Sequence, residues 1–291
     1  MSNITAPNPA VRRRSRHQSQ EQLSQWGLYL LVFVFLFLTF VPVYVMLSMS
    51  FKDNSQIYTN FWGLPDPWRW SNYEQGLKNI GHYTFNTVIN SVSSTVLVVL
   101  LASLSGYVFA RHRFPGKEYF YFGIVGLLAI PGILTLIPAF VTVRQLGIWN
   151  TAWALILTWT SGGQVIGIFL ARSFIAGLPE ELFEAGRIDG ATEFQLWYMV
   201  AVPLSWPILM TIAILHMVGT YNDFLWPLLV IGDDAKQVVS VGLTQFTSSF
   251  GVTEYGPQMA ANVIASIPLL ILFLFGMKYF IRGITSGAIK G

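Results

Sequence analysis

One stretch near the middle of the chain gathers five of its 14 acidic residues. The stretch LPEELFEAGRIDGATEFQLWYMVAVP, Leu178–Pro203, has Arg187 as its only base. Its acids fall within fourteen positions: Glu180, Glu181, Glu184, Asp189 and Glu193. A helix lying on an anionic lipid surface is normally rich in Lys and Arg, so this one is repelled by such a surface. The stretch therefore predicts a docking surface for a protein, with an ordinary solvated loop as the alternative.

A second group of residues has the chemistry of a saccharide contact. Sugar sites combine aromatic faces with amide or carboxyl groups, and these types stand together in Tyr221, Asn222, Asp223 and Trp226. Their position near the outer surface, at the end of a membrane span, argues against direct contact with a substrate. Both interpretations, with and without such contact, stay open from the sequence alone.

The sequence predicts no catalytic and no metal site. The chain has no cysteine, which excludes a thiol nucleophile and cysteine-based metal ligands. No HExxH motif occurs, and no GxxxxGK[ST] phosphate loop occurs, so the chain is not expected to be an ATPase by that route. Scattered basic residues and a net charge of +3 make nucleic acid an improbable partner.

Composition indicates an all-α integral membrane protein. Hydrophobic residues make up 53% of the 291 residues and charged residues only 11%, against about 25% charged residues in soluble domains. A span needs about 20 apolar residues, and six stretches are long enough. They are Trp26–Ser48, Val88–Ala110, Tyr119–Val143, Ala152–Phe174, Trp206–Trp226 and Ala260–Ile281.

Positive charge sets the expected orientation. If the N-terminus lies in the cytoplasm, 12 of the 17 Lys and Arg residues fall on the cytoplasmic side. Both termini are then cytoplasmic, and residues 1–25 form a basic cytoplasmic tail. The acidic stretch becomes a cytoplasmic loop between the fourth and fifth spans.

Local signals predict a helix, a tight turn and a second helix within the acidic stretch. Pro179 suits the first helical position, and the first helix should run to about Arg187. Gly190 is available for a left-handed turn, and Thr192 with Gln195 has capping-box spacing for the second helix.

Other signals predict how the spans pack. Small residues at Ala102–Gly106 and Ser161–Gly163 permit close helix contacts. Pro131 and Pro138 should kink the third span. His216, near mid-depth, is expected to be a hydrogen-bonded packing residue rather than a proton switch.

The acidic stretch resembles the EAA loop of ABC-transporter permease subunits. The matching positions are Glu184, Ala185, Gly186, Asp189, Gly190, Ala191, Val200, Val202 and Pro203. Gly186 replaces the usual second alanine, and two valines stand where Ile and Leu are usual. The segments NTVINSVSSTVLVVLLASLSGYVFAR, YNDFLWPLLVI and FIRGITSGAIKG are similar to carbohydrate-uptake permeases of the maltose type, MalG-like, so the resemblance covers residues 26–291.

This resemblance implies a sugar or oligosaccharide importer in the bacterial cytoplasmic membrane. Its expected partners are a second homologous permease, two cytoplasmic ATPase subunits that bind ATP and Mg, and an extracytoplasmic solute-binding protein. The chain itself would need no cofactor. The residues expected to couple to the ATPase are Leu182, Phe183, Glu184, Ala185, Gly186, Asp189, Gly190, Ala191 and Phe194, with Leu182, Phe183 and Phe194 as buried anchors.

Other functional classes remain as alternatives. A self-contained secondary carrier or channel is disfavoured because the spans lack a mid-depth carboxylate. An intramembrane enzyme lacks a visible catalytic constellation. A permease for a glycerol phosphate would favour arginines in the spans, which are absent.

Overall fold

The computed structural model describes residues 9–246 and 253–288, with side chains over 25–244 and 253–279. Every regular element in these residues is a helix. The long helices are α1 (Pro9–Ser50), α3 (Ser71–Arg111), α4 (Lys117–Gly126), α5 (Gly132–Gln145), α6 (Ala152–Ile175), α10 (Trp206–Tyr221) and α13 (Tyr255–Ala288). The short ones include α2 (Asn54–Thr59), α7 (Glu181–Ile188), α8 (Glu193–Leu196), α9 (Val202–Leu204), α11 (Leu225–Val230) and α12 (Val239–Gly242). A π-helical stretch, Trp197–Ala201, joins α8 to α9.

The helices confirm the all-α membrane class, with four to six spans. Four helices have unbroken span-length apolar segments: Gln25–Ser50, Ser71–Arg111, Ala152–Ile175 and Tyr255–Tyr279. Two further spans exist only as bent pairs. The chain turns by 105° between α4 and α5 and by 77° between α9 and α10.

Two predicted spans differ from the observed helices. The third, Tyr119–Val143, is broken rather than kinked because Pro131 has no N–H to continue the helix, whereas Pro138 lies inside α5. The fifth was expected to reach Trp226, but α10 ends at Tyr221. After Tyr221 the Asp223 carboxylate accepts a hydrogen bond from the Trp226 N–H at 3.4 Å, and the short helix α11 begins at Leu225.

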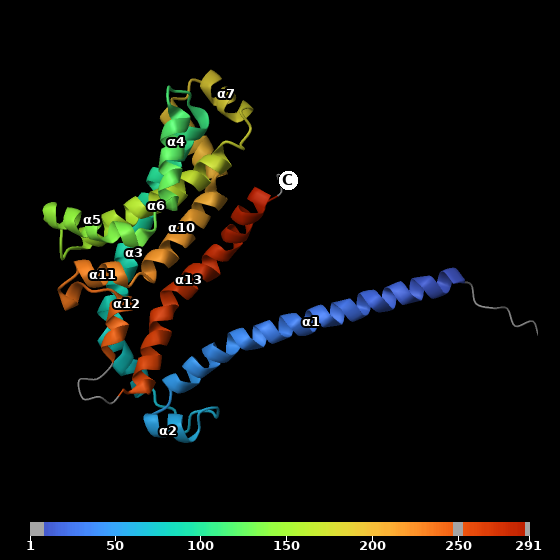
Figure 1. Cartoon of the computed structure of the whole chain (residues 1–291), viewed down its shortest axis with the longest axis vertical. Coiled ribbons are helices and arrows are strands. Elements are labelled where there is room, and N and C mark those ends of the chain that lie inside the picture. Colours follow the sequence, from blue (N-terminus) through green and yellow to red (C-terminus); the bar gives the residue numbers. More distant parts are fainter. Residues whose placement is uncertain (1–8, 247–252, 289–291) are drawn as a thin grey trace, which may run out of the picture.

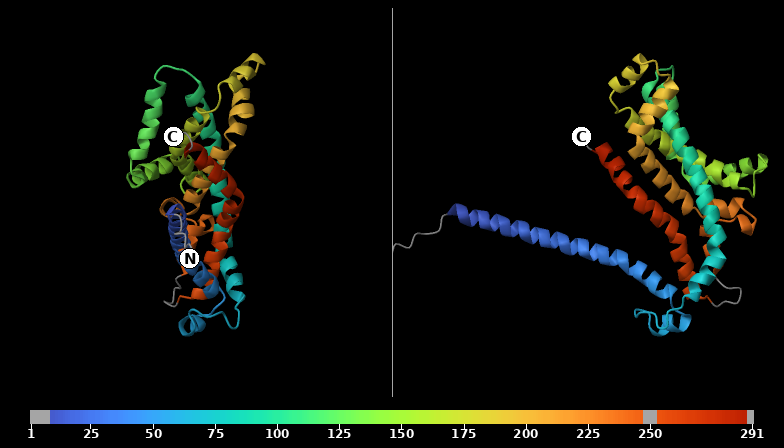
Figure 2. Two further views of the ribbon diagram at one scale, coloured as in Figure 1. Left: turned by 90° about the vertical axis from the view of Figure 1, so that its right-hand side faces the viewer. Right: turned by 180° about the vertical axis from the view of Figure 1, so that it is seen from behind.

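The helix is not interrupted at the predicted boundary between the tail, residues 1–25, and the first span. Helix α1 already begins at Pro9 and runs through to Ser50, while residues 1–8 lie outside the described part. No residue in the most apolar part of this helix is buried. Figures 1 and 2 show the C-terminal end of α1 next to the start of α13, while the rest of α1 projects away from the bundle.

Small residues bring α3 and α6 together, as the sequence predicts for Ala102–Gly106. A Cβ on Gly106 would lie 2.6 Å from the Cβ of Ala171, and one on Gly167 would lie 2.8 Å from the Cβ of Ala102. Real Cβ atoms do not come this close to other atoms, so only glycine fits at these two positions. The two helix backbones therefore approach closely. His216 of α10 packs against this pair, and its Nε2 lies 2.7 Å from Ser94 Oγ, which confirms it as a packing residue.

The two ends of the bundle carry different loops. Helix α2 lies at one end and α7 at the other (Figure 1). The core next to α7 is continuous with the bundle, because α3, α6 and α10 share one buried apolar cluster with α7 and α8. The α7 region is therefore part of the folded body.

Candidate functional site

The acidic element, residues 180–196, is built as the sequence predicts. Helix α7 ends at Ile188, and Gly190 adopts a left-handed φ of 82°. The Ala191 N–H donates to the Gly186 carbonyl at 2.9 Å, which closes the turn. Thr192 then caps α8 with the reciprocal bonds of a capping box with Gln195. Pro179 lies two residues before the helix and not at its first position.

Arg111 fastens the start of this element to the end of α3. Its side chain is only 6% exposed and forms an ion pair with Glu180. Its second terminal nitrogen donates to the carbonyls of Ile175 and Leu178, both at 2.7 Å. Its guanidinium lies 4.1 Å from the centre of the Phe183 ring. One arginine therefore joins α3, the end of α6 and α7.

Glu193 fastens the second half of the element to the same helix. The hydroxyl of Tyr107 donates to Glu193 Oε2 at 2.7 Å. Arg187 Nε donates to Glu193 Oε1 at 3.1 Å, and His112 Nε2 lies 3.4 Å from Oε2. The hydrogen bond with Glu193 raises the pKa of Arg187, so this base stays charged. Charge-assisted bonds of this kind are about twice as strong as neutral ones.

The remaining acids face outward. Glu181, Glu184 and Asp189 are exposed and form no ion pair within the described part of the chain. The apolar side chains beside them are exposed as well, with Ile188 at 85% and Phe194 at 63%. Leu182 is 44% exposed. This surface combines uncompensated negative charge with exposed apolar side chains.

One expected anchor is buried within the fold, and one exposed apolar side chain was not expected. Phe183 is 0% exposed, because it packs under Arg111 and beside Tyr107 in the core. Its ring cannot reach a partner without leaving the fold. Ile188, the last residue of α7, is exposed instead. Its place as an apolar residue next to the Gly190 turn is the sequence signal that could have indicated this. Ala185 and Gly190 are exposed, while Gly186 and Ala191 are half-buried.

The side chains of the cluster predicted as a possible saccharide contact make hydrogen bonds within the fold. Tyr221 is buried and donates to the Ala265 carbonyl at 2.7 Å, and Trp226 donates to the Ala154 carbonyl at 3.1 Å. Asp223 accepts from Trp159 Nε1 at 2.7 Å. The exposed Asn222 donates to its own helix. Tyr221, Asp223 and Trp226 are thus bonded to distant parts of the chain, which the sequence does not display.

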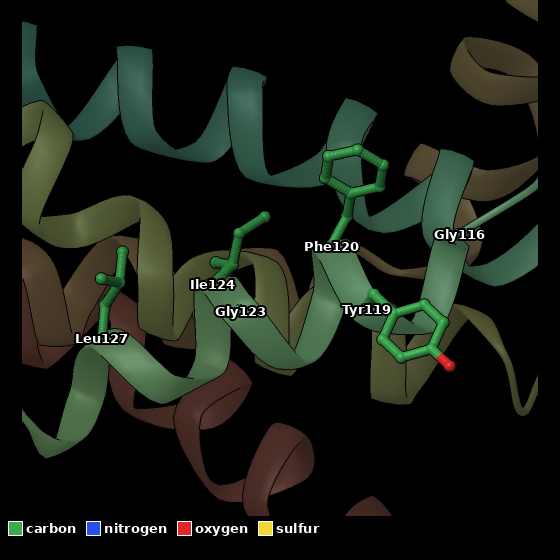
Figure 3. Close-up of a pocket in the computed structure, with 6 residues that line it drawn as sticks. All are labelled: Gly116, Tyr119, Phe120, Gly123, Ile124 and Leu127. Carbon is green, nitrogen blue, oxygen red and sulfur yellow. The ribbon is translucent and has the colours of Figure 1, made fainter.

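A groove on α4 is lined almost entirely by apolar atoms and has no charged side chain in its lining. It has a volume of about 440 Å³ and is lined by Gly116, Tyr119, Phe120, Gly123, Ile124 and Leu127. Figure 3 shows Phe120, Ile124 and Leu127 projecting from the helix, with the Tyr119 hydroxyl as the only polar side-chain atom among them. Such a surface suits lipid or another apolar helix.

Comparison with known proteins decides the family. The family described as "Binding-protein-dependent transport system inner membrane component" matches residues 99–286. The chain belongs to this family. It is therefore an inner-membrane permease component, a transport subunit without an ATPase site of its own. Membership of this family decides against the two alternative functions, a self-contained carrier or channel and an intramembrane enzyme.

Relatives of this permease cover nearly its whole length. The "Probable ABC transporter permease protein YurM" of Bacillus subtilis is 30% identical over 98% of this chain and 95% of its own. The "Diacetylchitobiose uptake system permease protein NgcG" of Streptomyces coelicolor is 32% identical over 86% of this chain and 84% of its own. A chain in the crystal structure of a bacterial ABC transporter for the acidic polysaccharide alginate has a TM-score of 0.80 at 22% identity. That match covers 90% of this chain and 98% of the other, which shows the shared fold.

Proposed function

We propose that this permease moves a sugar or oligosaccharide into the cell, driven by ATP hydrolysis in separate subunits. The supporting observation is the acidic element, which is tied to the bundle by Arg111 and Tyr107 and presents Glu184, Ile188 and Phe194 outward. A saccharide substrate is favoured because the relative from Streptomyces coelicolor is named for diacetylchitobiose uptake.

The α7 end of the bundle is proposed to face the cytoplasm. Five basic residues stand at that end, namely Arg111, Arg113, Lys117, Arg172 and Arg187. The positive-inside rule then puts both termini on the cytoplasmic side. The acidic element becomes the coupling helix region, residues 178–203, between the fourth and fifth spans.

ATP and Mg are proposed to bind only in the partner ATPase subunits. When these subunits close on ATP, a groove on their surface would move Glu184 and the exposed Ile188 with it. Arg111 and Tyr107 would pass this movement to α3, while the covalent connections pass it to α6 and α10. Closely packed helices shift as rigid units between discrete arrangements. The contact of the ATPase with the acidic element would therefore move α3, α6 and α10 together.

The exposed apolar helices support a second permease subunit. Helix α1 has no buried residue in the most apolar part of its span, and α4 and α5 expose most of their large apolar side chains. Lipid and a homologous partner would together cover these faces. At the α2 end, exposed Trp62, Trp68 and Trp70 belong either to the membrane interface or to contact with the solute-binding protein.

Reconstitution tests the proposal. The importer is assembled in liposomes with its ATPase, partner permease and binding protein, and ATP hydrolysis is measured with diacetylchitobiose, raffinose, an alginate oligosaccharide and glycerol 3-phosphate. Stimulation by at least one saccharide is expected. Stimulation by glycerol 3-phosphate alone, or by none of these compounds, contradicts the proposal.

A further inference from the structure

A largely apolar pocket with several polar side chains in its lining lies beside the half of α3 that is farther from α7. It has a volume of about 350 Å³, within the range of about 300–1,000 Å³ typical of ligand sites. The start of α6, the turn before it and the loop after α11 close the pocket. The side chains that matter are Phe85, Asn86, Asn90, Asn150 and Lys236.

Asn90 lines this pocket with an unused amide. The residue is only 6% exposed, and its side chain makes no hydrogen bond within the described part of the chain. An amide without an internal partner at the wall of a cavity is available to donate to and accept from a ligand.

Two further asparagines are held rigidly around the pocket. Asn150 adopts a left-handed φ of 59°, and its Oδ1 accepts from the Gly232 and Asp233 N–H groups, each at 3.0 Å. Its side-chain N–H₂ group is thus left for the pocket. Asn86 donates to the carbonyls of Ala235 and Gln237 at 2.9 and 3.0 Å, which leaves its Oδ1 as an acceptor.

The remaining walls decide which ligand fits. The Phe85 ring is 66% exposed and offers an apolar face. The ammonium group of Lys236 lies 3.3 Å from an Asp233 carboxylate oxygen, so its charge is offset. Fixed amide donors and acceptors beside one aromatic face, with no uncompensated charge, match hydroxyls and C–H faces of a neutral sugar ring.

We propose that this pocket binds one unit of a neutral saccharide on its way through the transporter. The inference rests on the proposed function and adds that this subunit contacts the substrate directly. It also separates this permease from its structural neighbour for an acidic polysaccharide. A uronate would have to draw Lys236 from its pair with Asp233, whereas a neutral sugar leaves that pair intact.

The absence of cysteine in the chain allows a direct test. Phe85→Cys and Asn90→Cys are placed singly in the assembled importer, together with Asn79→Cys as an exposed control on the same helix outside the pocket. Alkylation by a small, membrane-impermeant thiol reagent is measured on this subunit. The probe is diacetylchitobiose or raffinose, whichever stimulates ATP hydrolysis more strongly.

The saccharide should slow alkylation at positions 85 and 90 several-fold and leave position 79 unchanged. An alginate oligosaccharide should protect neither position. In a second arm, Asn90→Leu should lower saccharide transport about tenfold, the equivalent of one lost hydrogen bond, and Asn79→Leu should not. Saccharide-stimulated ATP hydrolysis without protection at either pocket position, or cysteines that the reagent never reaches, would overturn the pocket alone. Absence of stimulation by every saccharide would instead contradict the proposed function.

Discussion

The hydroxyl of Tyr107 lies 2.7 Å from Glu193 Oε2, although 86 residues separate them in the sequence. Tyr107 belongs to the last turns of α3, and Glu193 opens α8. The acidic element follows α6 and precedes α10 in the chain, and this contact connects it to α3 as well. Force applied to that element therefore has a route into α3 that does not follow the chain.

Replacing Tyr107 by Phe tests this route. The ring stays in the core, but the Glu193 carboxylate loses a neutral donor, so the folded complex should lose about 1–2 kcal/mol. Saccharide-stimulated ATP hydrolysis should fall more than the amount of assembled complex. Thermal unfolding and ATPase assays measure the two effects. Tyr198→Phe is the matched control, since Tyr198 is exposed and has no hydrogen bond in the described structure. Equal behaviour of the two variants would refute the route.

Arg111→Lys should uncouple transport without preventing membrane insertion. Arg111 pairs with Glu180 and also donates to two carbonyls, and a lysine ammonium cannot reproduce this forked geometry. We expect transport to drop several-fold at normal subunit levels in the membrane. Arg113→Lys serves as control, because Arg113 is exposed and forms no ion pair in the described part of the chain. Full transport by Arg111→Lys would show that the fork is dispensable.

Sequence reasoning predicted the local parts of this site well. The left-handed Gly190, the capping box of Thr192 and the close approach of α3 to α6 all depend on residues near one another or on residue size. Such features follow from the conformational limits of single residues, so one sequence is sufficient to find them.

The long-range contacts could not be predicted in the same way. Tyr107 and Arg111 share a helix face four residues apart, but nothing in the sequence pairs them with Glu193 and Glu180. Helix α7 has only eight residues, too few for periodicity to show that Phe183 points inward. The hydrogen bond of Asp223 was equally out of reach, because its partner Trp159 lies 64 residues away.

Gly190→Pro and Glu184→Lys should abolish saccharide-stimulated ATP hydrolysis while leaving insertion intact. Proline fixes φ near −65°, whereas Gly190 has a φ of 82° and donates its N–H to the Arg187 carbonyl at 3.1 Å. Glu184→Lys reverses an exposed charge on the docking surface. Gly190→Ala should be milder, at about 1–2 kcal/mol. Glu74→Lys, an exposed charge reversal at the other end of α3, is the control. Normal stimulation in either main variant contradicts the coupling assignment.

Gly106→Leu should prevent stable folding. A Cβ there would lie 2.9 Å from the backbone N of Arg172, and backbone cannot move aside as a side chain can. The helices must separate, which costs about 1–3 kcal/mol or more. Gly123→Leu is the control, because no atom lies within 4 Å of its added Cβ. Size-exclusion chromatography and unfolding temperature report the difference, and similar profiles for both variants would contradict the close α3–α6 packing.

Lys52→Met should damage the α2 end of the bundle, and it tests whether this end meets the solute-binding protein. Lys52 is 1% exposed, and its ammonium group donates to the carbonyls of Asn60, Phe61 and Gly63 at 2.8, 3.0 and 2.6 Å. Burial lowers the pKa of this lysine, and the three carbonyls compensate the charge only in this arrangement. Methionine fits the space but leaves three acceptors unpaired, so the loop carrying the exposed Trp62 should lose its shape.

The expected result for Lys52→Met is faster proteolysis between residues 53 and 70 and a several-fold weaker stimulation by saccharide-loaded binding protein. Lys78→Met is the matched control, because Lys78 is exposed and has no hydrogen bond or ion pair in the described structure. Weaker stimulation with an intact loop would assign Lys52 to direct contact, which its burial argues against. Unchanged proteolysis together with unchanged stimulation would mean that the loop keeps its shape without the ammonium group, and the three carbonyl bonds would then be a consequence of the fold rather than its cause.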